Sequence, residues 1–144
     1  MLTFSLLAPA LTQEPSYHMP DPSLTPGATI DVTSDDLCAS GFRSPARKIP
    51  VSVKGQAFSK YSLAANAVGD NVDNLIPTSL GGSNSIKNLW PQPLSGRWNY
   101  YLKNKLERRL RKMVCRGELD LKKAQEEIAT DWVRAYMKYL GDLR

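Results

Sequence analysis

Apolar residues recur every three or four positions between residues 98 and 114, and this spacing constrains the fold more than any other feature of the chain. The stripe consists of Trp98, Leu102, Leu106, Leu110, Met113 and Val114. Because an α-helix has 3.6 residues per turn, the spacing predicts a helix of about 18 residues with one buried face. Ser95 is expected to cap its start, and Gly117 is expected to end it.

A second apolar stripe follows and predicts a second helix with a buried face. Asp120 is its expected N-cap. The stripe consists of Leu121, Ala124, Ile128, Trp132, Tyr136 and Tyr139. Upstream, the pattern indicates a short helix within residues 51–68 and strands at 70–76 and 88–90, the second closed by Pro91 and Pro93. The glycine pair at 81–82 favours a turn between the strands, so we expect an α+β fold built on a hairpin.

The first 42 residues differ from the rest in proline content. Seven of the ten prolines fall within the first 50 residues, which argues against a helix there. We therefore expect an extended, proline-rich N-terminal arm over 1–42, ordered against the domain near 30–32 and Leu37, and one domain over 43–144. Residues 1–10 resemble the end of a secretory signal but lack its basic start. No apolar run is long enough to span a membrane.

Charge is also distributed unevenly. Residues 1–42 hold five acids and no Lys or Arg, so all 19 basic residues lie in 43–144 against nine acids. A region with a net charge of about +10 attracts polyanions, of which nucleic acid is the commonest. The alternative interpretation is an ordinary solvated basic surface. The oligomeric state is left open by the sequence.

Two cysteines and a single histidine, His18, exclude a zinc finger of the usual Cys/His type. Cys38 and Cys115 lie 77 positions apart, and two interpretations are open. A disulfide between them would stabilise the fold by about 4 kcal/mol in the loop-entropy treatment and would suit an exported protein. The other interpretation is a pair of buried thiols in a cytosolic protein. Together with the signal-like start, the pair slightly favours export, periplasmic or secreted, over the cytoplasm.

The motifs of nucleotide-binding loops, hydrolase elbows and zinc proteases are absent from the sequence. What stands out is a series of short motifs. It runs through Val72-Asp73-Asn74-Leu75-Ile76-Pro77, Gly81-Gly82-Ser83-Asn84, Lys87-Asn88-Leu89-Trp90-Pro91 and Arg97-Trp98-Asn99. Over residues 70–107 this series resembles the HNH endonucleases, whose fold is a small ββα-metal hairpin and helix.

The resemblance implies a hydrolase that cleaves phosphodiester bonds in DNA with one Mg²⁺ or Mn²⁺ ion. It assigns metal ligation to Asp73 and Asn99. It makes Asn88 the residue that orients the general base, and it lets Lys103 contact a phosphate. Beside such a core, the basic helix is expected to contact DNA, with RNA as a further option. The residues concerned are Lys105, Arg108, Arg109, Arg111 and Lys112.

The chain departs from the family at the general base, because Asn74 stands where the family has His. An amide cannot take a proton near neutral pH, and a general base is typically worth about 10² to 10⁴ in rate. Three explanations are open: an engineered inactivating change, a naturally degenerate member, or an enzyme that uses another base. The alternative functions are a non-catalytic nucleic-acid-binding protein and a secreted interaction module on a vestigial fold.

Overall fold

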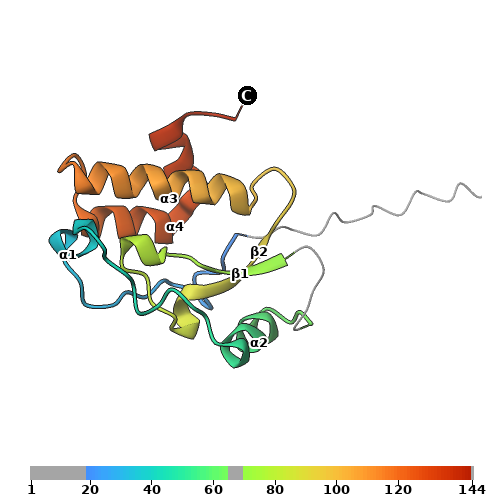
Figure 1. Ribbon diagram of the computed structural model, residues 1–144. Coiled ribbons are helices and arrows are strands. Elements are labelled where there is room, and N and C mark those ends of the chain that lie inside the picture. The colour runs from blue at the N-terminus through green and yellow to red at the C-terminus, as the bar shows by residue number, and fades with distance from the viewer. Residues whose placement is uncertain (1–18, 65–69, 144) are drawn as a thin grey trace, which may run out of the picture.

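A computed structural model of the chain describes residues 19–64 and 70–143. The fold combines helices with one small antiparallel sheet, which confirms the α+β prediction at that level. Figure 1 shows helices α3 (Tyr100–Cys115) and α4 (Leu121–Leu140) side by side on one side of the hairpin and helix α2 (Val51–Lys60) on the other. The signal-like start and His18 lie outside the described residues.

The sheet is a hairpin of strand β1 (Asp70–Asn74) and strand β2 (Leu89–Pro93). Val72 pairs with Pro91 and Asp73 with Trp90. The second strand continues through Pro91 and ends at Pro93, so the expectation that it stops at residue 90 was wrong, and of the two prolines only Pro93 closes it. Each strand of a two-stranded sheet has an open edge, where a proline without an N–H loses no ladder bond.

Each face of the hairpin packs against a different set of helices, since side chains alternate along a strand. Trp90 joins the main core with Leu106 and Leu110 of α3 (Tyr100–Cys115) and with Ile128 and Trp132 of α4. The other face packs Val72 and Leu89 against Ala57 and Phe58 of α2 (Val51–Lys60), the helix expected within 51–68.

Helix α3 confirms the strongest sequence prediction but starts later than expected. Its N-cap is Asn99, whose Oδ1 accepts bonds from the N–H groups of Tyr101 and Leu102, so the assignment of Ser95 was wrong. Gly96, at φ +93°, has turned the chain in between. Gly117 ends the helix as predicted. It adopts φ +72°, and the following N–H, of Glu118, donates to the Met113 carbonyl at 2.9 Å.

Helix α4 (Leu121–Leu140) begins after Asp120, whose carboxylate caps the Lys123 N–H as predicted. The helix is interrupted at Asp131, which has non-helical backbone angles. There, Asp131 Oδ1 accepts a bond from the N–H of Arg134 at 2.9 Å and so caps a second helical segment.

The N-terminal segment is ordered against the hairpin loop. The N–H of Gly27 donates to the Lys87 carbonyl, and that of Ile30 to the Gly81 carbonyl. A short helix, α1 (Ser34–Cys38), corrects the expectation of no helix in this region. Residues 27–44 contain no proline, and Thr33 and Asp36 form a capping box that starts the helix. Leu37 is buried, as expected.

A disulfide joins Cys38 of α1 to Cys115, the last residue of α3, with the two Cα atoms 5.5 Å apart. The disulfide interpretation is therefore confirmed over that of two buried thiols. The bond is compatible with an oxidising compartment. Arg111 adds a hydrogen bond from its guanidinium to the Leu37 carbonyl at 3.0 Å. Among the described helices, none has the length and apolar character needed to cross a membrane.

Candidate functional site

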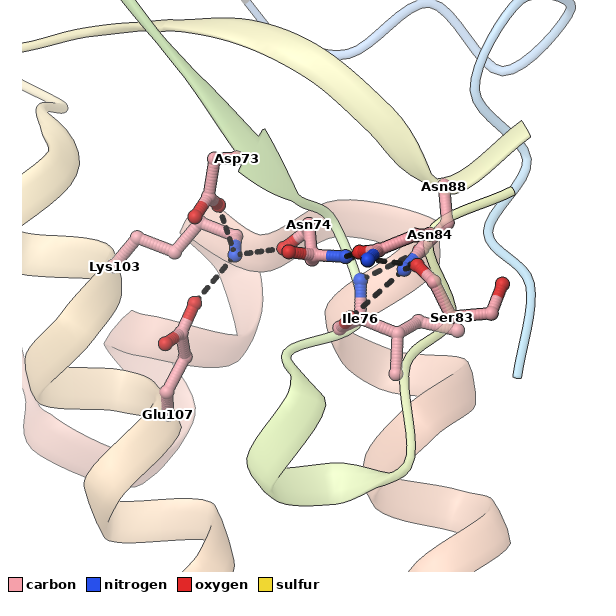
Figure 2. Close-up of polar contacts among 8 residues, drawn as sticks. All are labelled: Asp73, Asn74, Ile76, Ser83, Asn84, Asn88, Lys103 and Glu107. Carbon is pink, nitrogen blue, oxygen red and sulfur yellow. Dashed lines mark hydrogen bonds and ion pairs between the residues drawn. The ribbon is translucent and has the colours of Figure 1, made fainter. Parts of the chain in front are cut away.

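Lys103, near the start of α3, places its ammonium group at the end of strand β1 (Figure 2). The side chain is fully buried. Its Nζ donates to Asp73 Oδ2 at 2.7 Å, to the Asn74 carbonyl at 2.8 Å and to Glu107 Oε1 at 2.6 Å. An ammonium has three protons to donate, so these three oxygens satisfy it completely. In this structure Lys103 does not face solvent, and its predicted contact with a phosphate stays a prediction.

The charges of this cluster do not balance. Burial lowers the pKa of Lys103, but the attraction of Asp73 and Glu107 raises this pKa by more than burial lowers it. The pKa is therefore raised overall, and the amine stays charged. Burial raises the pKa of Glu107 to about 7; the ammonium opposes this rise and the Asp73 carboxylate adds to it. One ammonium therefore serves two carboxylates, and Glu107 is the one that tends to keep its proton.

Asn74, at the general-base position of the resemblance, uses its amide as a hydrogen-bond donor. Its Nδ2 donates to the Ser83 carbonyl at 2.8 Å and to Asn84 Oδ1 at 3.1 Å. Asn84 in turn donates to the carbonyl of Lys48. Through these contacts Asn74 connects the end of strand β1 to Ser83 and Asn84 of the hairpin loop, as Figure 2 shows.

Asn88 holds the two sides of the same loop together and is fully buried. Its Oδ1 accepts a bond from the N–H of Ile76, while its Nδ2 donates to the carbonyls of Ile76 and Ser83. Asn74 and Asn88 thus share the Ser83 carbonyl. The loop is tight enough to require glycine at 82, where an added Cβ would lie 1.7 Å from the Ile76 oxygen.

The contacts of the residues predicted to hold a metal ion do not fit such an ion. Asp73 Oδ2 binds the Lys103 ammonium, which would repel a second cation beside it. Asn99 Oδ1 is engaged in capping α3, and its Nδ2 donates to the Gly96 carbonyl. Within residues 19–64 and 70–143, no group of three or more His, Cys, Asp or Glu side chains is placed to hold an ion.

Glu107, Ser83 and Asn84 belong to this site but were not among the predicted site residues. Glu107 had a usable signal, because it is the one acid within the basic stretch 97–116 and lies four residues after Lys103. Ser83 contributes only its backbone carbonyl, which no sequence pattern specifies. Asn84 is brought to Asn74 by the loop, ten residues later in the chain.

A second feature lies on the outer face of α3 and continues onto its C-cap residue, Arg116. We call it the basic stripe: Lys105, Arg108, Arg109, Lys112 and Arg116, all exposed. At 100° per residue these five positions fall within an arc of about 100°, on the opposite side of the helix from Lys103. Among the described residues, none of the five pairs with an acid, and Arg111 lies outside the arc beside α1.

No family model, no curated protein and no solved structure matches the chain.

Proposed function

We propose that this protein binds nucleic acid through the basic stripe of α3 and does not cut it. Duplex DNA is the ligand that we propose. The observation that carries the proposal is the stripe itself, five exposed cations on one helix face with no acidic partner among the described residues. The HNH resemblance supports a phosphodiester backbone as the polyanion. In that case the hairpin and α3 are a nuclease core without its general base.

The spacing of the stripe favours a ligand over a merely solvated face. Positions three and four apart on a helix are neighbours, and like charges there destabilise the helix by a few tenths of a kcal/mol per pair. Lys105 and Arg109 form such a pair, as do Arg108 and Lys112. Phosphates placed along the stripe would replace this repulsion with attraction and release their condensed counterions.

Two features support binding without cleavage. Asn74 offers an amide where a proton acceptor is needed, and the Lys103 ammonium engages Asp73, the acid expected to bind metal. In addition, the stripe lies on the opposite side of α3 from Lys103, so phosphates held by the stripe are turned away from Asp73.

Fluorescence anisotropy of a labelled DNA duplex over a range of KCl concentrations tests the proposal. With five phosphate contacts, we expect log K to fall with log salt at a slope of roughly −4.5. Replacing four stripe residues by Gln should bring the slope near −1; these are Lys105, Arg108, Arg109 and Lys112. A slope near zero for the unchanged protein would contradict the proposal. Single-stranded DNA and duplex RNA show which nucleic acid is preferred.

A control of equal charge separates this surface from net charge alone. Four other exposed basic residues, Arg43, Arg47, Lys54 and Lys122, are replaced by Gln together. The control loses the same charge as the stripe variant, so a general attraction predicts equal losses of affinity. We expect the control to retain most of its binding.

A second candidate is DNA hydrolysis by an HNH endonuclease whose base has been replaced. It is supported by the HNH resemblance, in which Asn74 stands at the general-base position and Asn88 at the orienting position, and the two side chains meet at the Ser83 carbonyl. Plasmid cleavage with Mg²⁺ and Mn²⁺ compares the unchanged protein with Asn74→His. Cutting by the His variant alone would identify Asn74 as a silenced general base, whereas no cutting by either leaves binding as the function.

A further inference from the structure

We infer that the Lys103 ammonium is the built-in cation of this site, in the place where the HNH resemblance puts a metal ion, and that the protein therefore takes up no divalent ion at Asp73. This inference does not depend on the proposed function, because metal binding is measured without nucleic acid. It concerns the cation that the hairpin itself requires.

The first argument is the set of oxygens around Nζ. Two carboxylates and a backbone carbonyl, from Asp73, Glu107 and Asn74, converge on one point at 2.6 to 2.8 Å. Carboxylate and carbonyl oxygens are the ligands that Mg²⁺ and Ca²⁺ take in proteins. The hairpin and α3 have thus built a cation site, and a side chain of the same helix fills it (Figure 2).

The second argument is that the ammonium group already has a partner for each of its protons. The Lys103 side chain is fully buried, and each proton of its ammonium group has an acceptor. A divalent ion entering the site would have to displace it, leaving a buried charge without a partner beside the new one. Such an arrangement is strongly unfavourable, so the ammonium excludes the ion.

The third argument is what the cation holds together. Asp73 and Asn74 belong to β1, whereas Lys103 and Glu107 belong to α3, so Nζ joins the end of the strand to the helix. A metal ion in a small nuclease core would make this same connection. Because the Lys103 side chain makes this connection in the present protein, we expect chelators to leave the fold unchanged.

Titration with Mn²⁺, followed by electron paramagnetic resonance and by the melting temperature, tests the inference on the full chain. For the unchanged protein we expect no stoichiometric binding and the same melting temperature in Mn²⁺ and in EDTA. Lys103→Ala should open the oxygen site and bind one Mn²⁺ per chain, and adding Asp73→Asn should abolish that binding. Lys105→Ala, on the exposed face of the same helix, is the matched control and should bind none.

Three outcomes would overturn the inference. The first is one Mn²⁺ bound to the unchanged protein and lost in Asp73→Asn. The second is a folded Lys103→Ala protein that binds no Mn²⁺. If Lys103→Ala does not fold without metal, we expect Mn²⁺ to restore its circular dichroism spectrum. The third overturning outcome is a Lys103→Ala protein that folds neither with nor without Mn²⁺.

Discussion

The two faces of α3 treat positive charge in opposite ways. On the buried face a single lysine, Lys103, has three oxygen partners and no contact with water. On the outer face the five cations of the basic stripe are exposed, and none pairs with an acid among the described residues. One helix of 16 residues carries both arrangements.

The difference follows from the surroundings of each charge. A buried charge must be paired because its desolvation is costly, whereas water and salt screen an exposed one. Pairing of the stripe would be simple, since a single Glu among its members would have several basic neighbours. The inner charge is therefore expected to determine stability, and the outer charges are expected to determine binding.

The largest expected effect comes from removing the inner charge. Lys103→Met should destabilise the protein by about 3 to 5 kcal/mol, because two carboxylates are left without a counter-charge. Urea denaturation measures the loss. Lys105→Met is the matched control, and its free energy of unfolding should change by less than about 0.5 kcal/mol. Similar losses for the two variants would remove the distinction between the two faces.

The disulfide holds the C-terminal end of α3, near the last residues of the basic stripe. Replacing Cys38 and Cys115 by Ser should lower the free energy of unfolding by about 4 kcal/mol in the loop-entropy treatment, because the bond closes a long loop of the unfolded chain. Urea denaturation of the double variant checks this value. Unchanged stability would mean that α1 and the hairpin position α3 without the bond.

The third effect is a pH dependence that arises on the inner face. The pKa of Glu107 is raised from 4.5 to about 7, so the folded protein holds a proton that the unfolded chain releases. The contribution of this proton to the free energy of unfolding is complete below pH 4.5. It is lost as the pH rises to 7, and the loss is up to about 3 kcal/mol. Glu107→Gln should flatten this part of the stability profile. Glu126→Gln, on the exposed side of α4, should leave it unchanged.

Much of the helical structure could be predicted from the sequence because its signals are local. Apolar spacing located α3 and α4, and Asp120 and Gly117 acted at the predicted ends. The errors were local too. Ser95 and Asn99 are both good capping residues, and only the turn at Gly96 decides between them.

The inner cluster could be predicted only in part. A lysine at 103 lies on the same side of the helix as Leu106 and Leu110, which is a signal for a buried, paired charge. Its partner Asp73 lies 30 residues earlier and is brought in by the docking of the hairpin. Periodicity within one element carries no information about such docking, so the resemblance assigned Asp73 to a metal ion where the structure gives it an ammonium.

The smallest expected effect sharpens the comparison most directly. Arg109→Glu places an acid between Lys105 and Lys112, at helix spacings of four and three, and should stabilise the protein by about 0.5 kcal/mol. The same change should weaken duplex binding and reduce the salt slope by about 1. Arg109→Gln separates the loss of a positive charge from the gain of a negative one and should show about half of the gain in stability. If Arg109→Glu leaves binding unchanged or lowers stability, the unpaired charges of the stripe are not kept for a ligand. A gain in stability together with a loss of binding would mean that the outer face gives up stability to hold its polyanion, while the inner face uses the same type of charge to hold the fold.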